Sequence, residues 1–275
     1  MTIVVVGDVM ADVVAAHREP LAHGSDTAAS TELGGGGGGG NVAAWLADAG
    51  ADVALVGRVG TDALAEVALG GLEGVDVRVA RAMGERTGIC VVLVGPDGER
   101  TMLPDAGANS GLTERDLPDD LFAAGNVLYL SGYTLLRDGS RPAAQAALAR
   151  ARGHRMPIAL DAASAAPLER APAFMAWAGE VDVMLANAEE AAVLGDTPGV
   201  RELVVKRGAG GASWSDGERT IHVPAGPAEV RDTTGAGDAF AAGFLSAWPG
   251  SPEIALQRAT ALAARAVGLA GGRPG

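Results

Sequence analysis

Short apolar runs alternate with longer amphipathic segments along most of the chain. Residues 2–6, 126–130 and 203–206 are short and mainly apolar, as is typical of buried parallel strands. Residues 140–152 and 236–248 place apolar side chains three or four positions apart, as on packed helices. The same patterns predict further strands at 13–16, 52–56, 157–161, 181–185, 212–215 and 219–223, and further helices at 42–49, 63–69, 113–123, 171–178, 189–194 and 253–269. This alternation predicts an α/β fold, a doubly wound, mainly parallel sheet with helices on both faces.

The alternation is interrupted over residues 87–103. Two strand-like runs, 87–94 and 100–103, flank a turn that contains Asp97-Gly98, a pair typical of a β-hairpin. Hairpin strands do not belong to a strand–helix series, so together with residues 13–16 they predict a small separate sheet, a candidate lid. We therefore expect a single domain over residues 1–275, with lid strands from about 12–17 and 87–103.

Seven consecutive glycines, Gly34 to Gly40, precede Asn41. By composition alone such a run is typical of a linker. Because it is short, follows a strand-like region and ends at a residue suited to capping a helix, we interpret it as a loop whose backbone approaches a ligand, with Asn41 as the helix N-cap.

Polar residues follow the predicted parallel strands. Asp8, Asp161, Asn187 and Lys206 all fall at carboxyl ends of strands, the edge at which such sheets bind ligands. A further candidate site is the glycine turn over residues 231–240, which opens into a helix. Its bare N–H groups and the positive helix end can bind an anion, and Asp238 lies in the first helical turn. An anion site beside a potential base suits phosphoryl transfer, although glycine turns before helices are also common.

Composition narrows the possible partners. The chain has 275 residues and a formal net charge of −13, which argues against nucleic acid and requires any phosphate to be held locally. Cys90 is the single cysteine, and the four histidines lack metal-ligand spacing. No apolar run is long enough for a membrane span and no signal peptide is evident, so no membrane partner and a cytoplasmic location are expected.

Four separated segments together resemble the ribokinase-like sugar kinases, the PfkB carbohydrate kinase family. They are Gly7-x4-Asp12, Gly36-Gly37-x3-Asn41, Asn187-Ala188-Glu189-Glu190 and the stretch from Asp232 to Asp238, in the family's order. The resemblance runs from residue 2 to about residue 270 and implies a ribokinase-like fold with a lid. It also implies ATP-dependent phosphorylation of a hydroxyl group of a small sugar.

The resemblance assigns roles to individual residues. It implies that Asp238 is the catalytic base, with the anion hole formed by Gly235, Ala236 and Gly237. It implies that the sugar is bound by Asp12, Gly36, Gly37 and Asn41, and the nucleotide by Asn187, Lys206, Gly208 and Gly211. Glu190 would hold Mg²⁺ through water, and Asp232 and Thr234 match the surroundings of a monovalent cation such as K⁺. Since a helix N-terminus stabilises an anion, Asp238 is expected to be a weak base in the ground state.

Departures from the family pattern leave the substrate open. Met10 stands where ribokinases proper have Asn, and Gly38 where they usually have Lys. A nucleoside kinase of the same superfamily and a non-catalytic sugar-binding protein are the alternatives. Lys206 could contact a phosphate or point into solvent, and a homodimer formed through the lid is possible. A dinucleotide dehydrogenase is disfavoured because Gly7-Asp8-Val9 lacks the Gly-x-Gly-x-x-Gly turn.

Overall fold

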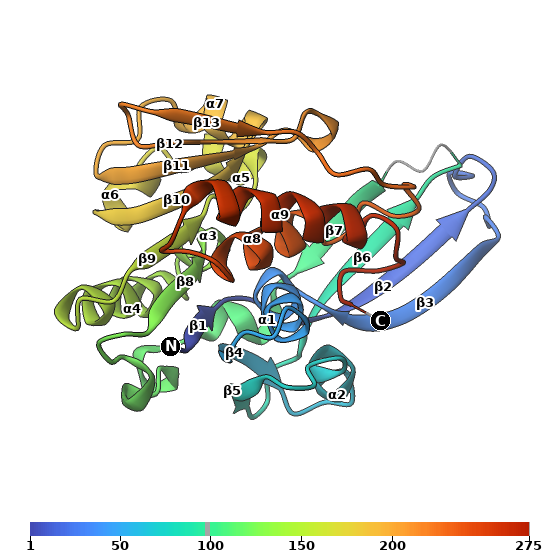
Figure 1. Ribbon diagram of the computed structural model, residues 1–275. Helices are drawn as coiled ribbons and strands as arrows, with labels where there is room; N and C mark the ends of the chain where they lie inside the picture. The colour runs from blue at the N-terminus through green and yellow to red at the C-terminus, as the bar shows by residue number, and fades with distance from the viewer. Residues whose placement is uncertain (97–99, 275) are drawn as a thin grey trace.

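The computed structural model describes residues 1–96 and 100–274 and contains a nine-stranded main sheet (Figure 1). In order across the sheet, its strands are β13 (Thr220–Val223), β12 (Ala212–Ser215), β11 (Val200–Lys206), β10 (Val181–Asn187), β9 (Ile158–Asp161), β8 (Val127–Ser131), β1 (Ile3–Val6), β4 (Val53–Gly60) and β5 (Asp76–Ala82). Neighbouring strands are parallel from β11 to β5, whereas β12 and β13 are added antiparallel. The mainly parallel sheet confirms the sequence prediction.

Helices cover both faces of this sheet, as predicted. Along β1, Ile3 and Val5 pack into one core while Val4 and Val6 pack into the other, because successive side chains of a strand point to opposite faces. The first core is covered by α1 (Gly38–Asp48), α2 (Leu64–Leu69), α8 (Ala236–Leu245) and α9 (Pro252–Ala266). The second is covered by α3 (Gly132–Leu136), α4 (Arg141–Gly153), α5 (Ala165–Glu169), α6 (Phe174–Ala178) and α7 (Ala188–Leu194). Within the described residues, no helix is both long and apolar enough to cross a bilayer.

A second, four-stranded sheet projects from the main body (Figure 1). Its strands, in order, are β3 (Ala29–Gly36), β2 (Met10–His17), β6 (Gly88–Val94) and β7 (Arg100–Asp105). The small sheet confirms the prediction made from residues 13–16 and 87–103, and β3 is a strand that the sequence pattern did not predict. The predicted Asp97-Gly98 turn lies outside the described residues. We call this sheet the lid sheet.

The helix predicted over residues 113–123 is wrong. That segment forms two short 3₁₀ helices, η2 (Glu114–Asp116) and η3 (Asp119–Leu121). Pro118 lies between them, and Leu117 before it is extended, with φ −92° and ψ 107°. Proline lacks an N–H donor and disfavours helical geometry in the preceding residue, so a continuous helix cannot pass this point.

The glycine run is neither a linker nor a loop, which corrects the prediction. Gly34 to Gly36 end β3, Gly37 makes the turn at φ 81°, and Gly38 to Gly40 form the first turn of α1. The helix N-cap is Gly37, so Asn41 lies inside the helix and is not its cap. Close packing explains part of the run, because a Cβ atom on Gly39 would lie 2.6 Å from the carbonyl carbon of Gly7.

Gly243 fixes the contact between α8 and α9 in the same way, since a Cβ atom there would lie 2.6 Å from the carbonyl oxygen of Arg258. We predict that Gly243→Ala lowers the free energy of unfolding by about 1–3 kcal/mol, because the two helices must move apart. Urea unfolding of Gly153→Ala is the control, since a Cβ atom at Gly153 meets open space. Equal effects of the two substitutions would contradict this packing argument.

Candidate active site

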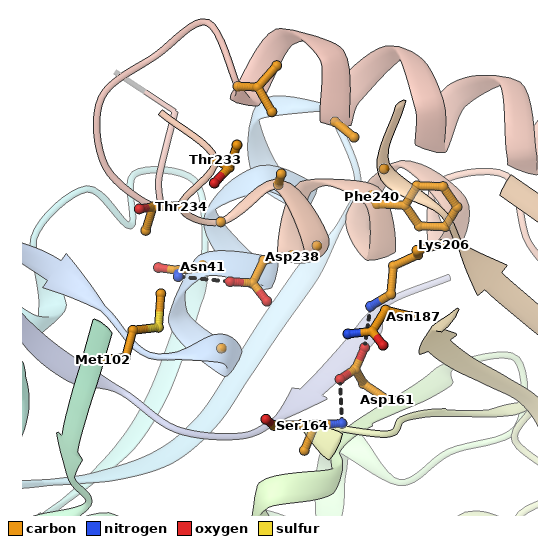
Figure 2. A pocket seen from close by; sticks show the side chains of 18 of the residues that line it. Asn41, Met102, Asp161, Ser164, Asn187, Lys206, Thr233, Thr234, Asp238 and Phe240 are labelled. Carbon is orange, nitrogen blue, oxygen red and sulfur yellow. Dashed lines mark hydrogen bonds and ion pairs between the residues drawn. The ribbon is translucent and has the colours of Figure 1, made fainter. Parts of the chain in front are cut away.

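A cavity of 1090 Å³ lies between the carboxyl ends of the parallel strands and the lid sheet. It is lined by the four strand-end residues Asp8, Asp161, Asn187 and Lys206, and on the lid side by Cys90, Val92, Met102 and Pro104. Segments distant in sequence therefore meet at one site, where the sequence analysis placed its candidates. Figure 2 shows part of this cavity.

Asp238 projects from the first turn of α8, whose N-cap is Gly235. Gly235 has φ 71°, and a Cβ atom on it would lie 2.5 Å from the carbonyl oxygen of Gly272, so only glycine fits there. Gly235, Ala236 and Gly237 border the cavity. Since N–H groups in the first turn of a helix have no acceptor within the helix, this edge of the cavity can donate to an anion.

The Asp238 carboxyl is held by Asn41, whose Nδ2 donates to Asp238 Oδ2 over 2.9 Å (Figure 2). Burial raises the pKa of Asp238 to about 7, against the lowering effect of the Asn41 hydrogen bond; Asp161 raises it further, whereas Lys206 lowers it. The expectation of a weak base stabilised by the helix end is therefore wrong, because burial outweighs the stabilising contacts. Near neutral pH this carboxyl can both accept and release a proton.

Asp12 lies on β2 and faces the cavity. Its Oδ1 is buried and has no hydrogen-bond partner among the described residues. Burial raises the pKa of Asp12 to about 6, although the nearby Arg273 lowers it. Gly36 is required beside it, because a Cβ atom there would lie 2.1 Å from the Asp12 carboxylate. A buried acceptor without a partner suits a ligand hydroxyl group.

Asn187 and Glu190 form a capping box at the start of α7. The backbone N of Asn187 donates to Glu190 Oε2 over 2.7 Å, and the backbone N of Glu190 donates to Asn187 Oδ1 over 2.8 Å. The Nδ2 of Asn187 also donates to Glu190 Oε1 over 2.7 Å. Burial raises the pKa of Glu190, while Lys206 lowers it. Both carboxylate oxygens are thus engaged by the chain, although the two residues still line the cavity.

Nothing in the described part of the chain forms a group of three or more His, Cys, Asp or Glu residues that could enclose a metal ion. Mg²⁺ does not require such an enclosure, because it retains several waters and is bound by few protein groups in phosphate sites. Glu190 contributes a carboxylate to the lining of the cavity near Lys206, so this mode of binding is open to it.

Lys206 points into the cavity, so of the two interpretations the solvent-facing one is wrong. Its Nζ lies 3.1 Å from Asp161 Oδ2, and its side chain is only 16% exposed (Figure 2). Burial lowers the pKa of Lys206, but Asp161 and Glu190 together raise it above its ordinary value. A Cβ atom on Gly237 would lie 3.7 Å from Nζ, which places a cation beside the start of α8. The following turn, with Gly208 and Gly211, also lines the cavity.

Asp232 holds the turn before α8 and has a cationic partner from the lid sheet. Its Oδ1 accepts from the backbone N of Thr234 at 2.6 Å, and its Oδ2 accepts from the backbone N of Gly271 at 3.0 Å. The Nη2 of Arg100 lies 2.6 Å from Asp232 Oδ1, and Arg100 Nη1 donates to Thr233 Oγ1 over 2.7 Å. This guanidinium supplies a positive charge beside Asp232, and the monovalent cation expected at Asp232 and Thr234 stays a prediction.

Sequence reasoning missed three arginines, Arg100, Arg137 and Arg273. Arg137 donates to both carboxylate oxygens of Asp8, over 2.7 and 2.5 Å, although the two residues are 129 positions apart. Asp8 is only 4% exposed, so this bidentate pair neutralises a buried charge. None of the three arginines belongs to a local motif, and the sequence carries no signal for their partners.

We predict that Arg137→Met lowers the free energy of unfolding by about 3–5 kcal/mol, because it leaves Asp8 buried without its cation. The double variant Asp8→Asn with Arg137→Met should recover much of that loss, since the unpaired charge is removed. Urea unfolding of both variants and the parent measures the difference. A double variant no more stable than Arg137→Met would contradict this explanation.

The sequence profile of the pfkB family carbohydrate kinases matches residues 1–274. The chain belongs to this family. The fold agrees, because adenosine kinase from Sinorhizobium meliloti superposes with a TM-score of 0.87 at 25% identity, covering 99% of this chain and 95% of that chain. Arabidopsis thaliana ribokinase, solved with ribose and ATP, superposes with a TM-score of 0.77 at 26% identity. The match covers 98% of this chain and 93% of that chain.

Similarity to curated relatives is confined to shorter segments. Fructosamine kinase FrlD from Bacillus subtilis is 41% identical over 75 residues, which is 26% of this chain and 26% of that protein. The matched segment thus spans about a quarter of that relative. The comparisons establish a family kinase and leave its substrate open.

Proposed function

We propose that this protein is an ATP-dependent kinase that phosphorylates a hydroxyl group of a small sugar, with Asp238 as the catalytic base. The observation that carries the proposal is the position of Asp238. Its carboxyl, with a pKa of about 7, lies in the first turn of α8, where Gly235, Ala236 and Gly237 border the same cavity. Membership of a carbohydrate kinase family and likeness to a ribokinase solved with ribose and ATP support it.

The chain's own groups divide the work of the reaction. Asn41 holds Oδ2 of Asp238, which leaves Oδ1 to accept the proton of the sugar hydroxyl group. Gly38 lies beside that oxygen, since a Cβ atom there would be 3.8 Å from Oδ1, and the absence of a side chain leaves room for the sugar. The first-turn N–H groups and Lys206 stabilise the negative charge of the transferring group. ATP, when bound, supplies the phosphoryl group.

The remaining site residues are assigned by their places around the cavity. Asp12, Gly36, Gly37 and Asn41 form the sugar side, where the unpartnered Oδ1 of Asp12 would accept from a hydroxyl group. Asn187, Lys206, Gly208 and Gly211 form the nucleotide side. Glu190 would hold Mg²⁺ through water, and the ion, when bound, would offset the negative charge of the phosphates.

We predict that Asp238→Asn lowers kcat by about 10²–10⁴-fold, because the base is lost while the binding surfaces remain. Turnover of ATP across a panel of pentoses, hexoses and nucleosides measures the rate, and melting shifts with ATP or sugar check that binding persists. Asp138→Asn is a matched control, since that side chain is 95% exposed. A variant as fast as the parent would rule out Asp238 as the base.

The pH dependence of kcat/KM should report the ionisation of the same carboxyl, that of Asp238. The deprotonated carboxylate is the active form, so kcat/KM should rise tenfold per pH unit below a pKa of about 7 and level off above it. Initial rates between pH 5 and 9 test this. An acid limb centred near the ordinary value of an aspartate, about 4, would contradict a buried base.

A nucleoside kinase is the second candidate, and the lid sheet favours it. Cys90, Val92, Met102 and Pro104 give the cavity an apolar wall opposite the polar groups. A nucleobase would pack against such a wall, and adenosine kinase from Sinorhizobium meliloti has the same fold. Competition of adenosine or inosine against free sugars, in ATP turnover and melting shifts, separates the two substrates. Sugar binding with no turnover would instead indicate a non-catalytic sugar-binding protein.

Pairing of two lid sheets in a homodimer stays a prediction. β3 and β7 form the edges of the lid sheet, and Leu33 and Leu103 on them are 54% and 55% exposed. Sedimentation of the protein with and without substrate measures the oligomeric state.

A further inference from the structure

After its last helix the chain returns to the turn before α8 and to α1. Gly271 donates its backbone N–H to Asp232 Oδ2 over 3.0 Å, and the carbonyl oxygen of Gly272 accepts from Trp45 Nε1 over 2.9 Å. Arg273 follows and is only 8% exposed. In Figure 1 the segment that follows α9 accordingly runs toward β2 and β3, at the base of the lid sheet.

The guanidinium of Arg273 is enclosed by backbone and glycines. Its Nη2 donates to the carbonyl oxygen of Gly36 over 2.8 Å, and its Nη1 donates to that of Gly70. A Cβ atom on Gly35 would lie 2.1 Å from Nη1, and one on Gly40 would lie 2.3 Å from Nη2. We call this enclosure the arginine socket. Because Gly35 in β3 and Gly40 in α1 leave room for the guanidinium, the socket explains why the glycine run extends into both elements.

The socket connects directly to the Asp238 carboxyl. Arg273 Nε donates to Asn41 Oδ1 over 3.4 Å, and Asn41 Nδ2 donates to Asp238 Oδ2 over 2.9 Å. A guanidinium has only donors, so it can accommodate the oxygen of the Asn41 amide but not its NH₂ group. Arg273 therefore fixes the orientation of the amide, with the NH₂ group toward Asp238.

We propose that Arg273 is a positioning residue for phosphoryl transfer, which through Asn41 holds the Asp238 carboxyl with one oxygen free for the substrate hydroxyl group. This inference rests on the proposed role of Asp238 as the base. It adds a residue near the C-terminus, and the glycines that enclose it, to the groups on which the reaction depends.

Charge strengthens the same conclusion. The titratable groups that surround Asp238 from the packed elements are Asp12, Tyr129, Tyr133, Asp161, Glu190, Lys206 and Arg273. Burial lowers the pKa of Arg273 to about 10, so it remains charged at neutral pH and offsets Asp12 and Asp238. Loss of this cation would raise the pKa of both carboxyls and move the acid limb of the rate above pH 7.

The experiment compares four variants with the parent. Arg273→Met removes both the positive charge and the N–H donors of the guanidinium, whereas Arg273→Lys keeps the positive charge but not the planar set of donors. Gly40→Ala keeps the arginine but displaces its guanidinium from the socket. Gly34→Ala, in the same glycine run, is the matched control, because a Cβ atom there meets nothing within 4 Å.

We predict that Arg273→Met and Gly40→Ala lower kcat by up to about 100-fold, because the base is misplaced. Both should move the acid limb of kcat/KM to higher pH, whereas Arg273→Lys should lower kcat but keep the limb near that of the parent. Gly34→Ala should match the parent both in kcat and in the position of the acid limb. The pH profile of kcat/KM distinguishes a positioning role from a loss of folded protein. A loss of folded protein would lower the rate at every pH without moving the acid limb.

Two outcomes separate this inference from the proposed function. If the parent transfers phosphate and Gly40→Ala and Arg273→Lys match it in rate and pH profile, Arg273 has no positioning role and the inference fails alone. If the parent transfers phosphate to none of the sugars or nucleosides, the proposed function fails. Carboxyl ¹³C NMR, with Asp238→Asn to assign the signal, then still measures whether Arg273→Met raises the Asp238 pKa.

Discussion

Repulsion among carboxylates is the constraint on which this site depends. Five carboxyl groups line one cavity, those of Asp8, Asp12, Asp161, Glu190 and Asp238. Buried charges are tolerated only when they are paired or shift toward their neutral form, and both solutions occur here. Arg137 pairs with Asp8 and Lys206 with Asp161, while Asp12 and Asp238 instead have raised pKa values. Glu190 also has a raised pKa, but both of its oxygens are held in the capping box, so the carboxyls that keep an oxygen available are Asp12 and Asp238, the two proposed to meet the substrate.

The architecture of the main sheet could be predicted because its central strands are buried on both faces and read as apolar runs. The strands that were missed carry no such signal. β3 is largely exposed and contains neither an apolar run nor a clear alternation, and β5 is a partly exposed edge strand. The helix predicted over residues 113–123 failed because periodicity does not register the effect of Pro118. Local patterns thus identify buried elements best and exposed edges worst.

The candidate site was predictable in its motifs and not in its arginines. Asp12, Asn41 and Asp238 belong to motifs that could be read from the sequence, and they line the cavity together. Arg137 lines this cavity and Arg273 contacts the lining residue Asn41, and their partners Asp8 and Asn41 are 129 and 232 positions away in the sequence. No periodicity or spacing encodes such a pair, because only the folded sheet brings the partners together. The glycine run was misread for the same reason, since its purpose depends on a side chain near the other end of the chain.

The contact of Arg100 with Asp232 and Thr233 has a consequence for the kinetics of the lid sheet. One ionic contact joins the lid sheet to the turn that borders the proposed phosphate site, between side chains that are 12% and 16% exposed. Any outward movement of β7 must separate that pair before solvent can fully solvate the two charges. Partial burial makes such a separation costly and only weakly sensitive to salt. Any opening of the lid sheet would therefore have to cross an electrostatic barrier located in the turn before α8.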